Sequence, residues 1–267
     1  MELEWYNPLM LRPTTQRIIA LLEEKSGYPV QVIEEPGLPV FASMRIARDP
    51  LPAHILKLKS LTPPPVDYTT CLQCSLVLRL FACEPEQRYL ISAAPEGFRA
   101  IGALLHAPNG LVERFGIPPE KANSLRDQLL QGLVLHLHSI AIGLRVSQTL
   151  TIDYPDLLDL EAEHVEREYR QNLGSLSDEY RQVFPEKVFS AMHKISAAYA
   201  LFWAGRMERP ELVNPYHLFG FDQGGERLLQ IFESIPSTPE HDCELVDQWA
   251  DYLGIRGWYS WLPYIAP

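Results

Sequence analysis

The chain has 267 residues, of which 46% are hydrophobic and 21% charged, and this composition excludes wholesale disorder. Its 23 basic and 34 acidic residues give a formal net charge of −11, which argues against a phosphate backbone as the main partner. The densest basic stretch, residues 45–59, is interrupted by apolar residues and by Asp49. We therefore expect a folded protein that does not bind nucleic acid.

The opening Met-Glu-Leu-Glu-Trp-Tyr has no basic segment followed by an apolar run, so no signal peptide is expected. The longest apolar candidate, residues 129–146, is interrupted by polar side chains and Arg145, which argues against a membrane span of about 20 apolar residues. Four cysteines without an export signal indicate reduced thiols. The prediction is a cytoplasmic protein with no membrane contact.

The first part of the chain predicts mixed structure. A helix begins at Thr14 and ends at Gly27, a residue type that favours the left-handed conformation at helix ends. Two short strands rich in Val, Ile and Phe are expected at 29–34 and 39–46. Residues 54–59 alternate apolar and polar side chains, which is typical of a half-buried strand.

Three consecutive prolines, 63–65, then exclude helix, and Asp67 is expected to cap a helix over 68–83. Residues 89–94 predict one further short strand. The remainder reads as helix, and we expect helices at 120–152, 156–172, 186–204, 226–233 and 240–253. Whether 120–152 is one helix or two stays open, and the alternation within 133–142 also allows a strand.

These elements predict an α+β fold with a small N-terminal β-sheet and a predominantly helical remainder. Pro210 and Pro215 bracket a polar segment that is the weakest joint along the chain. We expect a domain over 1–205 and a helical C-terminal extension over 206–267 packed on it, with one single domain as the alternative.

The helix expected after the proline break carries a degenerate motif. Leu72-Gln73-Cys74-Ser75-Leu76 resembles a His-Glu-Cys-Gly-His form of the HExxH zinc-peptidase pentad, with both His replaced by Leu and Glu by Gln. Residues 144–157 look like the helix that supplies the third ligand, and Ser147 stands at the position of that Glu. Over about residues 14–170 the chain is therefore similar to the glutamate-type zincins, which implies a zincin-like fold for 1–205.

The replacements remove the chemistry that the resemblance would carry. Leu72 and Leu76 offer Zn²⁺ no lone pair, and the Gln73 amide takes no proton from a metal-bound water near neutral pH. Ser147 is a poor replacement for a carboxylate ligand. We expect no catalytic residue, no metal and no cofactor, with apolar volume filling the former metal hole. The alternative, a buried helix unrelated to any metal site, stays open.

Cysteine and histidine pairs give weaker indications. Cys71 and Cys74 suggest a metal or redox site, but no second ligand pair follows in the sequence, so core packing is the favoured interpretation. His136 and His138 point about 200° apart on a helix and do not chelate one ion there. Adjacent residues His241-Asp242-Cys243 cannot converge as a nucleophilic triad, and a solvated helix start is expected instead.

Two further surfaces are predicted. The acidic run 156–168, in which Glu163 and Arg167 stand four residues apart, is expected to form a solvated helix face. The C-terminal segment is aromatic, and its Trp258, Tyr259 and Trp261 are candidates for docking a partner or a second copy of the chain.

The functional hypothesis is a non-catalytic, metallopeptidase-like binding or regulatory module that binds a protein or peptide in the former cleft. One alternative is a metal-dependent hydrolase whose ligands include Cys71, Cys74 and a distant His. Another is a structural subunit that self-associates, as a homodimer for example, through its aromatic tail.

Overall fold

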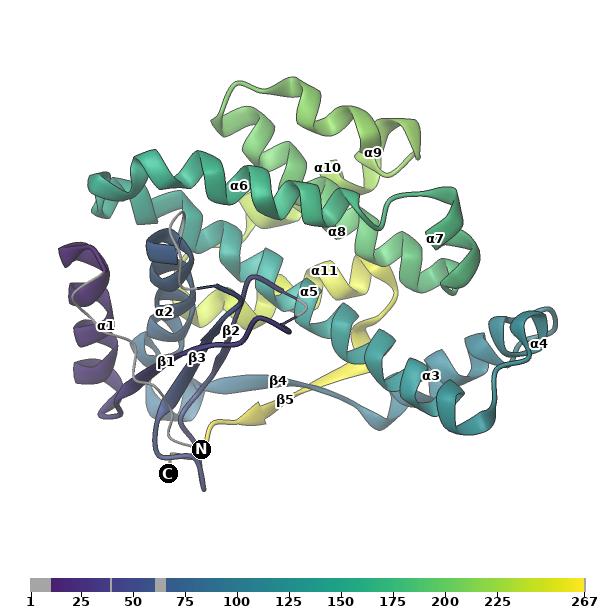
Figure 1. Ribbon diagram of the computed structural model, residues 1–267, viewed down its shortest axis with the longest axis horizontal. Helices are drawn as coiled ribbons and strands as arrows, with labels where there is room; N and C mark the ends of the chain where they lie inside the picture. Colours follow the sequence, from purple (N-terminus) through teal and green to yellow (C-terminus); the bar gives the residue numbers. More distant parts are fainter. Residues whose placement is uncertain (1–10, 39, 61–65, 267) are drawn as a thin grey trace. The chain divides into compact units, whose positions relative to one another are not determined.

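A computed structural model describes residues 11–38, 40–60 and 66–266 of the chain. It consists mainly of helices, with one three-stranded and one two-stranded sheet among these residues, which confirms the α+β class (Figure 1). The chain divides into two compact units. Unit 1 comprises the described residues of 1–89, 145–167 and 263–267, and unit 2 comprises 90–144 and 168–262.

Unit 1 contains the three-stranded sheet, in the order β1 (Val30–Glu34), β3 (His54–Leu58) and β2 (Ala42–Arg45). β1 runs parallel to β3, and β2 runs antiparallel to it. The central strand β3 is buried at four of its five positions, whereas β1 and β2 are partly exposed. The strands expected at 29–34 and 54–59 are thus confirmed, and the Pro39 end of the third lies outside the described residues.

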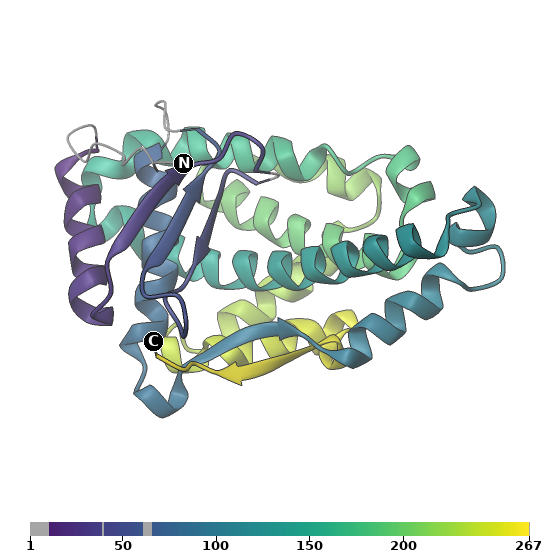
Figure 2. The same ribbon diagram turned by 60° about the horizontal axis from the view of Figure 1, so that its bottom comes forward.

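Helices α1 (Pro13–Ser26) and α2 (Val66–Ala82) pack against each other within unit 1. α1 ends as expected, because Gly27 adopts a left-handed φ of 79° and its N–H donates to the Glu23 carbonyl. Buried side chains of the two helices meet residues 146–160 in one hydrophobic cluster. Figure 2 shows α1 at one end of this unit and α2 behind the sheet.

The chain passes from one unit to the other within two long helices, α5 (Pro119–Asp153) and α6 (Leu158–Leu173). α5 is one continuous helix, which settles the choice between one helix and two and excludes a strand at 133–142. A short 3-10 turn at Pro155–Leu157 leads into α6. By length and composition α5 is able to cross a membrane, but a core helix meets the same criterion, and 67% of its most apolar 18-residue window is buried.

Unit 2 holds the other helices, which are α3 (Pro95–Leu105), α4 (Leu111–Phe115), α7 (Asp178–Val183), α8 (Glu186–Arg206), α9 (Asn214–Leu218), α10 (Asp222–Ser234) and α11 (Asp242–Leu253). α8 and α10 pack closely, because Gly225 has no side chain and a Cβ there would lie 2.8 Å from the Ala197 Cβ. β4 (Tyr89–Ala93) pairs with β5 (Tyr259–Pro263). The pair is antiparallel, because Ala94 N–H donates to the Trp258 carbonyl and Tyr264 N–H to that of Arg88.

The structure corrects several boundaries. The division of the chain does not fall at 205/206, since α8 and α10 stand on either side of that point and pack within the same unit. α10 begins at Asp222 and includes Gly224 and Gly225, which the sequence placed before the helix. The two glycines lie inside the helix because a side chain at either position would collide with the neighbouring α8.

Candidate functional site

The pentad 72–76 lies on α2, and a helix was expected here. Leu72 and Leu76 are partly buried and pack against the hydrophobic cluster of unit 1, which includes Val146 and Leu150 of α5. Gln73 is also partly buried, and Ser147 is buried with 5% of its surface exposed. These leucines therefore contribute apolar contacts to the core. Whether they replace former metal ligands stays a prediction.

The cysteines on α2 are core residues. Cys71 and Cys74 are free thiols with no exposed surface, and burial raises the pKa of the Cys71 thiol to about 12. Burial also raises the pKa of Cys74, with the neighbouring Cys71 adding to the effect. Neither thiol is therefore a ready thiolate for redox chemistry or metal binding. Among the described residues, no group of three or more His, Cys, Asp or Glu side chains is arranged to hold a metal ion.

The other sequence candidates do not converge on one site. His136 Nε2 lies 3.0 Å from the Ser196 hydroxyl, whereas His138 lies against the Trp261 ring, with ring centres 6.2 Å apart. Burial lowers the pKa of both imidazoles to about 4. His241 ends a 3-10 turn directly before α11, and its Nδ1 lies 3.0 Å from the Thr238 hydroxyl, so its ring is directed to Thr238.

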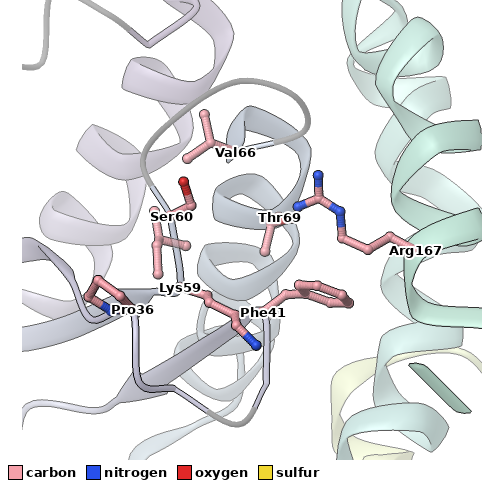
Figure 3. Close-up of a pocket in the computed structure, with 8 residues that line it drawn as sticks. Pro36, Phe41, Lys59, Ser60, Val66, Thr69 and Arg167 are labelled. Atoms are coloured by element: carbon pink, nitrogen blue, oxygen red, sulfur yellow. The ribbon is translucent and has the colours of Figure 1, made fainter. Parts of the chain in front are cut away.

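A cavity of about 350 Å³ lies within unit 1, at one edge of the three-stranded sheet. The carboxyl ends of the parallel strands β1 and β3 meet at this edge, and the amino end of the antiparallel β2 meets them there. In open α/β sheets, the carboxyl ends of parallel strands are where ligands commonly bind. The described lining residues are Pro36, Phe41, Leu58, Lys59, Ser60, Val66, Thr69 and Arg167 (Figure 3).

Backbone hydrogen bonds hold the strand ends around the cavity. The N–H of Lys59 donates to the Phe41 carbonyl over 2.9 Å, and the N–H of Glu35 donates to the Leu58 carbonyl over 2.8 Å. The Lys57 ammonium pairs with the Glu35 carboxylate at 2.5 Å, outside the cavity lining. The loop residues that follow the strands are thereby fixed in place by the sheet itself.

Arg167 of α6 supplies a cation to the cavity wall. Its guanidinium carbon lies 5.1 Å from the centre of the Phe41 ring, a cation–π contact, and Figure 3 shows its nitrogens directed toward Thr69. The Glu163 carboxylate is 3.9 Å away, at the limit of ion pairing. The Glu163–Arg167 pair was expected from the sequence. The use of Arg167 as a cavity residue was not, because a helix pattern carries no information on what a distant strand brings to it.

A buried imidazole lies directly behind the cavity. The Thr69 hydroxyl is 3.1 Å from His164 Nδ1, and the His164 ring packs on Tyr68 with ring centres 4.8 Å apart. Burial lowers the pKa of His164 to about 3, and the charge of Arg167 lowers it further. His164 is therefore neutral throughout the physiological pH range.

Further polar side chains fix the two helices that bear these residues. The hydroxyls of Tyr68 and Thr151 both donate to Glu161 Oε1, at 3.3 and 3.1 Å. Asp67 does not cap its own helix as expected. Instead its carboxylate accepts from the Thr15 hydroxyl at 2.5 Å and from the Arg12 N–H at 2.8 Å, so it joins α2 to α1.

The aromatic C-terminal residues are largely used inside unit 2. Trp258 and Tyr259 retain 7% and 3% of their exposure, so most of their area is not available to a partner. The Tyr259 hydroxyl and the Trp261 indole N–H both donate to Asp247 Oδ1, at 2.7 and 2.8 Å. Arg256 donates to the other oxygen of Asp247 at 2.6 Å. Of the three candidate docking residues, only Trp261 remains partly exposed, and its role in docking stays a prediction.

Comparisons with protein-family models, with curated proteins and with solved structures find no match to this chain. The site is therefore characterised by its own geometry.

Proposed function

We propose that this chain is a non-catalytic binding module, and that the cavity at the sheet edge of unit 1 is its ligand site. The observation that carries this proposal is the combination of cationic, hydroxyl and apolar side chains around one cavity of about 350 Å³. Small-molecule sites are typically concave and mostly apolar, with a few convergent polar groups, and their volumes begin near this size.

The chemistry of the cavity supports binding rather than catalysis. The Thr69 hydroxyl and the His164 imidazole have the spacing of a nucleophile and a general base. However, a pKa of about 3 makes His164 a poor acceptor for the proton of a threonine hydroxyl. Cys71, two residues after Thr69 on α2, is a protonated thiol and is equally unreactive.

The zincin resemblance is compatible with this function and remains part of the proposal. In that interpretation, Leu72 and Leu76 stabilise a scaffold that has lost its metal ligands, and a small ligand or a peptide binds at the sheet edge. We also propose a cytoplasmic location. A second role, self-association through Trp261, is supported only by the partial exposure of this residue on β5.

Ligand screening by NMR tests the proposal. The full chain, labelled with ¹⁵N, is titrated with a small-molecule set that contains neutral, cationic and anionic compounds. We expect at least one chemical class to shift the amide signals of residues 41, 58–60, 66 and 69 in a saturable manner. A set that leaves all of these signals unchanged would refute the assignment of the cavity as a ligand site.

Metal analysis tests the competing hydrolase. If tag-free protein contains stoichiometric zinc that is lost in Cys71→Ser, then the non-catalytic proposal is wrong. Light scattering of a chain ended after Leu253 tests self-association, which predicts that an oligomer is lost. The variant Trp261→Ala removes the proposed docking residue alone and keeps the remainder of β5, so it should lose the oligomer as well if Trp261 mediates self-association.

A further inference from the structure

If the cavity is the ligand site proposed above, its side chains also define the chemical class of the ligand. We infer that the cavity of unit 1 binds a monocarboxylate with a compact apolar body, either a small free acid or the C-terminal residue of a peptide. In this arrangement Arg167 binds the carboxylate, Lys59 is a second cation of the lining, and the body packs on Phe41, Leu58 and Val66.

The positive side chains define the charge of the ligand. Arg167 and Lys59 both line the cavity, and neither Asp nor Glu is among its described lining residues. The chain as a whole has a net charge of −11, so an anion gains nothing from the long-range field and must be held by local contacts. The two cations of the lining therefore favour an anionic ligand over a cationic one.

The geometry of Arg167 favours a planar anion. Its guanidinium carbon lies 5.1 Å from the centre of the Phe41 ring, and Figure 3 shows its nitrogens directed toward Thr69, at the cavity. A carboxylate accepts two parallel N–H bonds from the edge of a guanidinium. The Glu163 carboxylate already stands 3.9 Å from Arg167, which shows that this oxygen chemistry is compatible with the position. A ligand carboxylate must compete with Glu163 and wins only if its apolar body is also buried.

The remaining lining defines the body of the ligand. Pro36, Phe41, Leu58 and Val66 present carbon, whereas Ser60 and Thr69 offer single hydroxyls. A sugar would place many hydroxyls, and a phosphate ester additional charged oxygens, against this apolar wall without partners, which costs free energy. Since burial of apolar area contributes roughly 25 cal/mol per Å², a branched or aromatic group of a few carbons suits the cavity.

The experiment compares matched ligands on the full chain. The first arm uses 3-phenylpropionate against its uncharged amide, and the second uses a tripeptide ending in Phe with a free or an amidated C-terminus. Affinity is measured by ¹⁵N NMR titration, with the signals of residues 41, 59, 66 and 69 as the site report. We expect at least one of the two acids to bind at this site about tenfold or more tightly than its amide.

The protein variants separate a specific site from general electrostatics. Arg167→Gln and Lys59→Gln are each expected to weaken binding of the acid by about tenfold. Lys25→Gln removes an equally exposed lysine of α1 in the same unit and is expected to leave the affinity unchanged. Folding of each variant is checked from its NMR spectrum, and Phe41→Leu, which keeps apolar volume but removes the stacking partner of Arg167, gives a second report on the site.

The outcomes distinguish this inference from the function on which it rests. If the amide binds as tightly as the acid at these residues, then the ligand class is wrong, although the cavity remains a binding site. If Arg167→Gln and Lys25→Gln have equal effects, then the carboxylate position is wrong. If neither acid nor amide shifts the cavity signals and no compound of the broader set does so, then both proposals are wrong. Binding by only one of the two acids identifies whether the source is a free acid or a peptide end.

Discussion

Asp247 of α11 holds the C-terminal aromatic residues in unit 2, and its removal gives a sharp test of the structure. Its carboxylate accepts from the Tyr259 hydroxyl at 2.7 Å, from the Trp261 indole N–H at 2.8 Å and from Arg256 at 2.6 Å. The helix that bears it is itself fixed, because the buried Trp249 donates its indole N–H to the Leu228 carbonyl at 2.9 Å. The variant Asp247→Ala therefore leaves three donors without their acceptor.

The size of the effect follows from the burial of these donors. Tyr259 is 3% exposed, so its hydroxyl loses a charge-assisted bond and has little access to water, which costs about 1.5–3 kcal/mol. Trp261 and Arg256 are partly exposed and can bond to water, so they add about 1 kcal/mol together. We expect Asp247→Ala to lower the free energy of unfolding by about 3 kcal/mol.

Urea unfolding followed by tryptophan fluorescence measures this change. Asp251→Ala, an exposed position on the same helix, is the matched control and is expected to change the stability by less than about 0.5 kcal/mol. Hydrogen exchange of β5 provides a local report, because amide protection should fall in that strand first. Equal stability of the two variants would refute the role of Asp247 as an anchor.

Three further predictions follow from buried groups. Burial lowers the pKa of His54 to about 4. The stability that its neutral form contributes is therefore complete above pH 6.5 and is lost as the pH falls toward 4. His54→Gln should flatten this part of a pH–stability curve measured by urea unfolding. Gly225→Ala places a methyl group 2.8 Å from α8 and should lower the free energy of unfolding by about 1–3 kcal/mol. Gly132→Ala, with open space around it, should instead stabilise α5 by about 0.5–1 kcal/mol. Equal Tm shifts of the two variants would contradict this packing. With a thiol reagent at pH 8, the partly exposed Cys243 should react in the folded protein, and Cys71 should react only after unfolding. Rapid labelling of Cys71, followed by mass spectrometry, would contradict its burial.

The mechanism behind the His54 prediction is visible in its contacts. The backbone N–H of Ala47 donates to Nδ1 at 3.1 Å, so this nitrogen is an acceptor and the proton is carried by Nε2. Nε2 lies 2.9 Å from the Ser26 hydroxyl. Protonation of Nδ1 would abolish the bond from Ala47 and bury a charge, which is why acid destabilises this part of unit 1.

Local sequence signals predicted the helices that have caps and periodicity. Gly27 marked the end of α1, and Pro185 marked the start of α8 at the residue before it. They failed for β5, because residues 259–263 carry no alternation of their own and become a strand only by pairing with β4. They also failed at Gly224-Gly225, where close packing overrides low helix propensity.

Periodicity and side-chain hydrophobicity were sufficient to predict the α+β class, the order of the main helices and the burial of Cys71 and Cys74. The position of the cavity follows from the tertiary structure alone. The cavity joins strand ends, the first turn of α2 and Arg167 of α6, and no local pattern relates residues so far apart in the chain.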